Sequence, residues 1–216
     1  MGKIAIVCPG QGSQTPGFLS PWLELNAFAE SIDALEAASG VELRKHGTLS
    51  DADAIRDTSI AQPLIVAAGI ASLHSLFGQS KVSERIFGVS GHSVGEITAA
   101  VASGIFTAEQ GIKFVKERGD AMALAAGLEP TSMAAILGGD QSVVEARLAE
   151  LDLEPANYNG GGQIVAAGAA AAIGELQAEG PAGARVIPLQ VAGAFHTRYM
   201  APAVSTLAAY AAGLTV

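Results

Sequence analysis

Residues 85–103 read RIFGVSGHSVGEITAAVAS, and this stretch sets the expected fold of the chain. Residues 85–89, mostly apolar after Arg85, are typical of a short buried strand, and residues 96–103, mostly small after Glu96, predict a helix. Between them, Gly91-His92-Ser93-Val94-Gly95 places glycines two residues either side of a serine. Glycine permits a sharp turn, so the pattern predicts a nucleophilic serine where the helix begins and favours developing negative charge. A glycine-rich loop that merely connects the two elements is the alternative.

Composition narrows the class of protein. Half of the 216 residues are apolar, 15% are charged and the net charge is −9. These values indicate one large or two small α/β domains and argue against a nucleic-acid binder, which needs clustered cations. Cys8 is the only cysteine, so neither an intramolecular disulfide nor a thiolate zinc site is possible, and we expect no metal.

Two apolar segments bear on membrane targeting. Residues 58–80 carry no Asp, Glu, Lys or Arg, but Gln62, Pro63 and His74 interrupt them, which favours a buried helix over a membrane span. The apolar run at residues 3–8 is too short for a signal peptide. We therefore expect a cytoplasmic protein without a membrane partner.

The first half of the chain predicts a parallel sheet with helices. Residues 3–8 are a nearly continuous apolar run, as in a strand buried on both faces, and a glycine-rich turn follows at 9–14. Helices are expected at 21–38, 59–77 and 107–126. Thr107 and Gln110 predict a capping box at the start of the last of these.

Beyond Pro130 the pattern changes to short alternating elements. Strands are expected at 133–137, 155–158, 162–167 and 185–191, and helices at 141–151 and 170–178. The resulting order, βαββαβ, is typical of a ferredoxin-like unit. We expect a large α/β subdomain at 1–129, a ferredoxin-like small subdomain inserted at 130–192, and a return to the large subdomain at 193–216.

A serine nucleophile needs a base, and the chain has four histidines. His92 adjoins Ser93 in the turn, where successive side chains diverge, while His46 and His74 lie in segments without another catalytic signal. His196 follows the last expected strand and opens a new helical stretch. Active-site loops gather at the carboxyl ends of strands in open α/β sheets, so His196 is the candidate base. A histidine that only caps a helix start is the alternative.

Arg118 is the second unusual residue. On the helix expected at 107–126 it has Phe114 and Met122 four residues to either side, which places it on or beside an apolar face. A buried guanidinium needs a partner, because an unpaired buried charge is costly. It is either an arginine that reaches the rim or pairs with a protein carboxylate, or a bidentate clamp for a substrate carboxylate.

Six motifs carry a family resemblance. They are Pro9-Gly10-Gln11-Gly12-Ser13-Gln14, Gln62-Pro63, Gly91-His92-Ser93-Val94-Gly95-Glu96, Arg118-Gly119 with Met122, Asn157-Tyr158-Asn159 leading to Gln163, and Gly193-Ala194-Phe195-His196. In this order and spacing, over essentially the whole chain, they resemble the malonyl-CoA:acyl carrier protein transacylases and the acyltransferase domains of polyketide synthases. The resemblance implies an α/β fold with a hydrolase-like parallel-sheet large domain and an inserted ferredoxin-like small domain.

The resemblance also implies a catalytic centre. Ser93 matches the nucleophile that takes the acyl group as an ester, and His196 matches the base that activates it. The backbone N–H groups of Gln11 and Val94 match the oxyanion hole, in agreement with the general rule that the residue after an elbow serine donates one of its two bonds.

Substrate recognition is implied in the same way. Arg118 matches the arginine that binds the malonyl carboxylate, and Gln62 and Asn159 match residues that line the acyl pocket. The implied substrates are malonyl-CoA and the phosphopantetheine thiol of an acyl carrier protein, with no bound cofactor and with ping-pong kinetics in fatty acid or polyketide synthesis. Family members continue beyond Val216 with strands and a glutamine loop, so we expect reduced or absent transacylase activity from residues 1–216.

Two other functions remain open at this point. A serine thioesterase or esterase could use the same elbow, although such an enzyme has no need of Arg118 and usually orders its histidine with an acid. A carrier-binding subunit without catalysis is the third possibility. The fate of an acyl group on Ser93 distinguishes the three.

Overall fold

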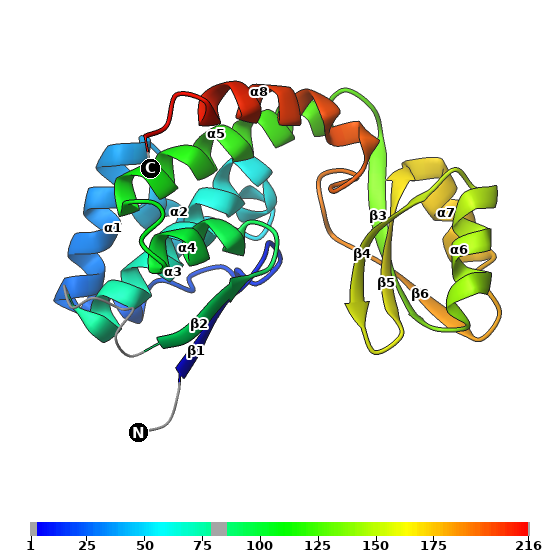
Figure 1. Cartoon of the computed structure of the whole chain (residues 1–216), viewed down its shortest axis with the longest axis horizontal. Helices are drawn as coiled ribbons and strands as arrows, with labels where there is room; N and C mark the ends of the chain where they lie inside the picture. The colour runs from blue at the N-terminus through cyan, green and yellow to red at the C-terminus, as the bar shows by residue number, and fades with distance from the viewer. Residues whose placement is uncertain (1–3, 79–85, 216) are drawn as a thin grey trace. The chain divides into compact units, whose positions relative to one another are not determined.

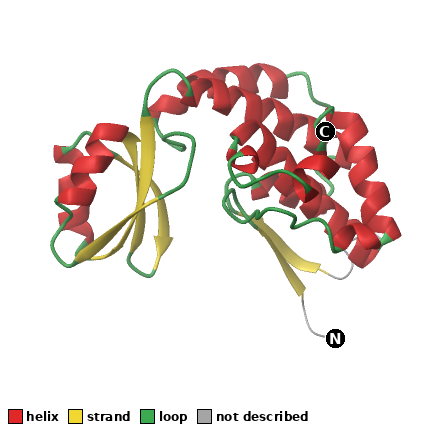
Figure 2. Cartoon of the chain, turned by 180° about the vertical axis from the view of Figure 1, so that it is seen from behind, coloured by secondary structure: helices red, strands yellow, loops and turns green. Residues whose placement is uncertain are grey.

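The computed structural model describes residues 4–78 and 86–215. The chain forms two compact units, and each is described by itself. Unit 1 comprises residues 1–120 and 209–216, and unit 2 comprises residues 121–208. Figure 1 follows the chain through both, and Figure 2 colours the same elements by type.

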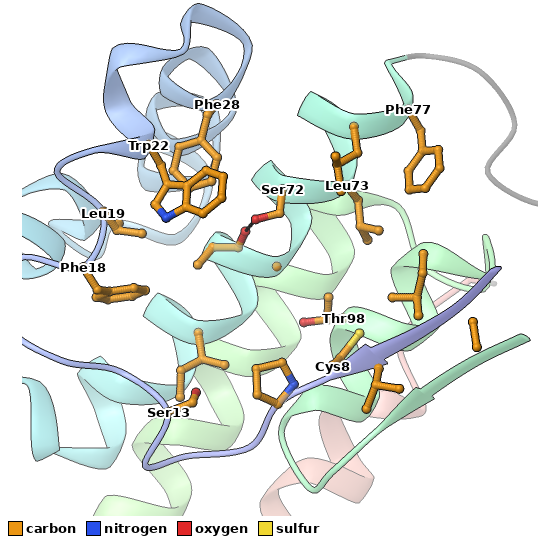
Figure 3. Close-up of a pocket in the computed structure, with 18 of the residues that line it drawn as sticks. Cys8, Ser13, Phe18, Leu19, Trp22, Phe28, Ser72, Leu73, Phe77 and Thr98 are labelled. Atoms are coloured by element: carbon orange, nitrogen blue, oxygen red, sulfur yellow. Dashed lines mark hydrogen bonds between the residues drawn. The ribbon is translucent and has the colours of Figure 1, made fainter.

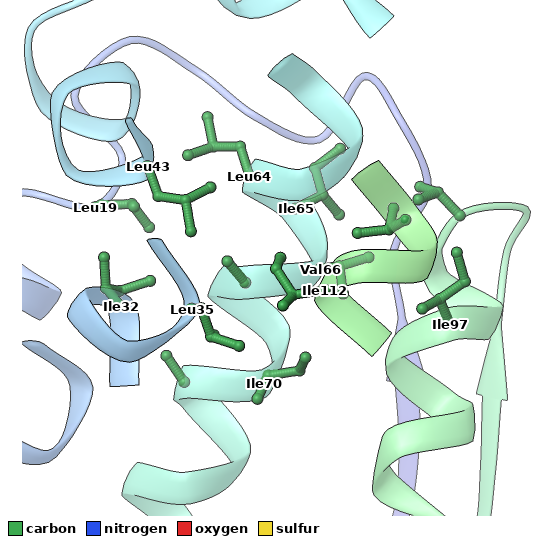
Figure 4. Packing of buried hydrophobic residues seen from close by; sticks show 14 of the residues in the cluster. Leu19, Ile32, Leu35, Leu43, Leu64, Ile65, Val66, Ile70, Ile97 and Ile112 are labelled. Carbon is green, nitrogen blue, oxygen red and sulfur yellow. The ribbon is translucent and has the colours of Figure 1, made fainter. Parts of the chain in front are cut away.

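Unit 1 is built around a mostly helical core. Its elements are the 3-10 turns η1 (Trp22–Glu24) and η2 (Ala54–Arg56), the helices α1 (Asn26–Ser39), α2 (Leu43–Thr48), α3 (Thr58–Phe77) and α4 (Gly95–Ala102), and most of α5 (Ala108–Ala126). Leu64, Val66 and Ile70 of α3 are fully buried against α1 and α5 (Figure 4). The expected capping box of α5 is confirmed, since Thr107 and Gln110 each bond the other's backbone N–H.

Helix α3 is the longest element of the core. Asp57 caps it by accepting the Ser59 N–H, and the mostly buried side chains of its first four turns confirm the sequence expectation of a buried helix. By length and apolar composition alone, α3 would also pass as a membrane span, a test that core helices of other proteins pass too. Its apolar surface is used inside unit 1.

Strands β1 (Ile4–Cys8) and β2 (Ile86–Gly91) form a parallel pair. We expected β1 to be buried on both faces, and this is wrong for the described structure. Ile6 and Cys8 point toward the helices, whereas Val7 is 77% exposed and Phe87 of β2 is 73% exposed. An apolar run identifies the strand, but whether its second face is covered depends on tertiary packing.

A cavity of about 530 Å³ lies between β1 and the helices of unit 1. Its walls are largely apolar, and the labelled aromatic side chains in Figure 3 come from the segment before α1, from η1, and from α1 and α3. They are Phe18, Trp22, Phe28 and Phe77. The hydroxyl of Ser72 in its wall is bonded to the Ala68 carbonyl of its own helix.

Unit 2 contains a four-stranded antiparallel sheet. Its elements are β3 (Thr131–Gly138), α6 (Gln141–Glu150), β4 (Glu154–Gly160), β5 (Gln163–Ala169), α7 (Ala170–Ala178) and β6 (Ala184–Pro188). The strand order is β4-β5-β3-β6, and α6 and α7 cover one face (Figure 1). The expected order of elements is confirmed, although β6 ends at Pro188, three residues before the expected Val191.

The other face of this sheet explains where the units divide. Met133 and Val165 pack there against Met122 of α5 and against Phe195 and Met200. The segment after β6, with η4 (Arg198–Met200) and the start of α8 (Ala201–Ala211), therefore belongs to unit 2. From sequence, we placed residues 121–129 and 193–208 in the large subdomain instead. The apolar contacts of these two segments with the sheet of unit 2 account for the difference between the expected and the observed division.

Candidate active site

The turn between β2 and α4 holds Ser93 at φ +52°, a backbone conformation rare for a residue with a side chain. A Cβ at Gly91 would stand 2.2 Å from the Gly95 carbonyl carbon, and one at Gly95 would stand 2.3 Å from the Cys8 carbonyl oxygen. Both positions therefore require glycine. Strand, turn and helix occur as expected, and the strained serine is typical of a nucleophile elbow.

The glycine-rich turn after β1 packs directly against this elbow. The His92 N–H donates to the Cys8 carbonyl at 3.0 Å, and a Cβ at Gly10 would meet His92 Nδ1 at 2.7 Å. The segments that carry the Gln11 and Val94 N–H groups are thus neighbours within unit 1. Val94 immediately precedes α4, where backbone N–H groups favour negative charge.

Arg118 of α5 reaches Ser93, the candidate nucleophile. Its Nη2 donates to Ser93 Oγ at 3.3 Å, and its Nη1 donates to Oε1 of Gln62 at 2.5 Å. Gln62 is only 1% exposed. Burial lowers the pKa of the Arg118 guanidinium from its usual value and Glu96 opposes that effect; an arginine remains charged at neutral pH even so.

The chemistry of these partners matters more than their number. Both partners of Arg118 are neutral, so the guanidinium charge is not cancelled by a direct ion pair in the described part of the chain. A half-buried cation held beside a nucleophile by neutral groups attracts an anion. From sequence, Arg118 either reaches the rim or pairs with a protein carboxylate, or it clamps a substrate carboxylate. In the described structure the amide of Gln62 orients the guanidinium and leaves its charge available.

Gly119 is a residue whose role sequence reasoning missed. A Cβ there would stand 2.9 Å from the Thr58 carbonyl oxygen and 3.2 Å from the Ser59 Cα. Helix α5 therefore approaches the first turn of α3 backbone to backbone, next to Arg118 and Gln62. The Arg118-Gly119 pair stands in the sequence, but the need for glycine follows from a contact sixty residues away.

His196 and Asn159 lie in unit 2, so their partnership with Ser93 stays a prediction. His196 is exposed and has φ +61°. Its loop is fixed within unit 2, because the Ala194 N–H donates to Thr131 Oγ1 and Thr197 Oγ1 donates to the Ala194 carbonyl. The side chain of Asn159 bonds Gln163 across the β4–β5 hairpin.

No cluster of three or more His, Cys, Asp or Glu side chains suited to a metal ion occurs among residues 4–78 and 86–215. Around Ser93, the described part of unit 1 offers a hydroxyl, backbone N–H donors and the guanidinium of Arg118. This set suits acyl transfer to or from an anionic acyl group.

The family model described as the acyl transferase domain matches residues 5–215. The chain belongs to the acyl transferase domain family. The acyl transferase domain is 47% identical to the malonyl CoA-acyl carrier protein transacylase of Mycobacterium tuberculosis over 211 residues, which are 98% of this chain and 70% of the relative. It is 35% identical to the Staphylococcus aureus protein of the same name, over 93% of this chain and 66% of that one.

Solved structures agree with these relatives. The acyl transferase domain matches the crystal structure of MCAT from Mycobacterium tuberculosis with a TM-score of 0.93 and 47% identity, over 99% of this chain and 71% of that one. It also matches a malonyl-transacylase solved in complex with a type II PKS acyl-carrier protein, with a TM-score of 0.86 and 27% identity. That match covers 99% of this chain and 71% of the other. A mixed α/β fold of this family is thereby established.

Proposed function

We propose that this acyl transferase domain moves a malonyl group from malonyl-CoA to the phosphopantetheine thiol of an acyl carrier protein, through an ester on Ser93. The observation that carries the proposal is the guanidinium of Arg118, which contacts Ser93 Oγ while its own partners are neutral. A malonyl carboxylate would supply an anion in direct contact with the guanidinium, beyond the more distant influence of Glu96. The names of the related proteins support the same substrates.

In the first half-reaction, Ser93 Oγ attacks the thioester carbonyl carbon and its proton passes to His196. The N–H groups of Gln11 and Val94 bind the oxyanion of the tetrahedral intermediate. The C–S bond then breaks, and the departing CoA sulfur takes the proton from His196. The malonyl group remains on Ser93 as an ester, with its free carboxylate on Arg118 and with Gln62 holding the guanidinium in place.

In the second half-reaction, His196 removes the proton of the carrier thiol. The thiolate attacks the ester carbonyl, the bond to Ser93 Oγ breaks, and Ser93 regains its proton from His196. Because one substrate leaves before the other reacts, the kinetics are ping-pong. Asn159 is proposed to line the acyl pocket from the second unit. No bound cofactor takes part in this scheme.

The proposal also includes the type of each domain and the cellular compartment. The parallel β1–β2 pair that leads into the elbow supports a hydrolase-like large domain, and the strand order β4-β5-β3-β6 supports a ferredoxin-like small domain. We assign residues 1–129 and 193–216 to the former and 130–192 to the latter. We place the protein in the cytoplasm, where acyl-CoA substrates occur.

Intact-mass spectrometry of the protein after incubation with malonyl-CoA tests the proposal. One malonyl adduct per chain, mapped to Ser93 and lost on addition of carrier protein with matching gain by the carrier, is the expected result. An adduct that decays at the same rate with and without carrier indicates a serine hydrolase instead. If malonyl-CoA gives no adduct and an active-serine phosphonate does not label Ser93, the protein is a carrier-binding subunit without catalysis.

A further inference from the structure

The turn at residues 9–14, which carries Gln11, is held by the side chains of its own last two residues. Oε1 of Gln14 accepts the Gly12 N–H at 2.9 Å, and Nε2 of Gln14 donates to the Ile55 carbonyl at 3.0 Å. Ser13 Oγ donates to the Gly10 carbonyl at 3.0 Å. All three distances are those of well-formed hydrogen bonds. The Gln14 side chain thus ties the turn to η2, and the preceding Ser13 side chain folds the turn back on itself.

These bonds fall on the two peptide units that flank Gln11. The Gly10 carbonyl belongs to the same planar peptide unit as the Gln11 N–H, so the Ser13 hydroxyl fixes the direction in which that N–H points. The Gly12 N–H belongs to the next peptide unit, which Gln14 holds. Gly12 has φ +104°, a region open to glycine, so without these bonds the turn has many accessible conformations.

We propose that Gln14, assisted by Ser13, is a positioning residue that keeps the Gln11 N–H aimed at the oxyanion. The inference rests on the proposed function, which uses that N–H. An oxyanion donor lowers the barrier to the extent that it is oriented before the reaction begins. Gln14 does not touch the substrate; it acts through the backbone of Gln11 and Gly12. The bond to Ile55 anchors this orientation to the turn that leads into α3, the helix that carries Gln62.

The chain supplies a matched control for this glutamine. Gln110 is also half-buried in unit 1, and its amide bonds in the same manner: Oε1 accepts the Thr107 N–H at 2.8 Å and Nε2 donates to the Thr215 carbonyl at 2.8 Å. It serves the cap of α5 and does not touch the turn at residues 9–14. A loss common to any such glutamine appears at both sites, and a loss specific to the oxyanion hole appears only at Gln14.

The test compares Gln14→Leu with Gln110→Leu in single-turnover acylation by malonyl-CoA. Gln14→Leu is expected to slow the acylation step about 10-fold with the dissociation constant of malonyl-CoA unchanged, because the oxyanion forms only in the transition state. Ser13→Ala is expected to slow it about 3-fold, since water competes for the exposed Gly10 carbonyl. Gln110→Leu is expected within about 2-fold of the wild type. Equal effects at both glutamines, a wild-type rate for Gln14→Leu, or a loss confined to malonyl-CoA binding would overturn the inference.

A second variant supplies a signature that lost packing does not give. In Gln14→Glu the ionised carboxylate still accepts from Gly12 but has no proton for the Ile55 carbonyl; once protonated it can make both bonds. Its acylation rate divided by that of the wild type is therefore expected to rise as pH falls toward 5. A flat ratio contradicts the proposal, and Gln110→Glu is the control.

Hydrogen exchange at the Gly12 amide separates this inference from the proposed function. We expect at least about 10-fold faster exchange in Gln14→Leu than in the wild type, whether or not the protein acylates. If the wild type fails to acylate, the proposed function fails; faster Gly12 exchange then still supports the tether by Gln14, and unchanged exchange overturns it.

Discussion

The turns that follow β1 and β2 tolerate fewer side chains than the strands that precede them. In the turns, glycines at 10, 91 and 95 permit backbone contacts that a methyl group would prevent, and side-chain amides hold individual peptide groups. In the strands, Val7 and Phe87 remain mostly exposed. The positions at which a single added methyl group would clash are therefore concentrated in the turns. The strands need only be apolar and extended. Substitutions should divide the two regions sharply.

The largest effect is expected at Ser93. Ser93→Ala removes the proposed nucleophile and should lower transfer of a malonyl group to the carrier by roughly 10³-fold or more, with no adduct by intact mass. Ser103→Ala, which removes a hydroxyl at the far end of α4, should transfer at the wild-type rate. A malonyl adduct that persists in Ser93→Ala would show that another residue is the nucleophile.

Arg118→Ala is expected to come next. Loss of charge-assisted hydrogen bonds of about 3 kcal/mol corresponds to about 10²-fold slower acylation by malonyl-CoA, with acylation by acetyl-CoA far less affected. Rates for the two thioesters measured side by side check this. Lys116→Ala, which breaks a partly exposed ion pair with Asp120 on the same helix, is the control and should leave both rates unchanged. Equal loss for both substrates contradicts the carboxylate clamp.

Gly119→Ala should have a smaller effect of the same kind. The added methyl group pushes α5 away from the Thr58 carbonyl and lengthens the contact between Arg118 and Gln62. We expect acylation by malonyl-CoA to slow about 10-fold, or about 1.4 kcal/mol, with a smaller change for acetyl-CoA. Gly111→Ala adds a methyl group to the same helix, against a Val101 methyl about two turns from Arg118, and should not alter the ratio of the two rates.

The smallest effect is expected in the strands. Val7→Ser should change the free energy of unfolding by about 0.5 kcal/mol or less, because its side chain is 77% exposed. Ile70→Ala, at a fully buried position of α3, should cost about 2–5 kcal/mol in the same denaturant titration. A loss of several kcal/mol at Val7 would mean that this face is covered in solution.

Local patterns were sufficient for most of the elements and for the elbow, although the helix expected at 21–38 begins only at Asn26, after the separate turn η1. The βαββαβ order, the cap at Thr107 and the strand-turn-helix around Ser93 each depend on neighbours in sequence, so they could be predicted. Helix α2 (Leu43–Thr48) and the turn η2 were missed because six and three residues are too short to show a period. The exposure of Val7 could not be predicted, because an apolar strand does not reveal what covers its second face.

The site was predictable in its residues and not in its contacts. That Arg118 needed a partner followed from its apolar neighbours; that the partner is the amide of Gln62 depends on how α3 and α5 meet. Gln14 drew attention only as part of a motif, because its bond to Ile55 spans 41 positions. The pairing of Ser93 with His196 across the two units stays a prediction.

The backbone at Ser93 sets a conflict between folding and reactivity. At φ +52° a glycine would be accommodated without the steric cost that an L-residue pays, of about 1–2 kcal/mol. The position proposed as the nucleophile is therefore also one where replacement by glycine would make the fold more stable. A selection for variants with a higher melting temperature, run without a screen for activity, should recover Ser93→Gly. That variant would have no nucleophile for acyl transfer.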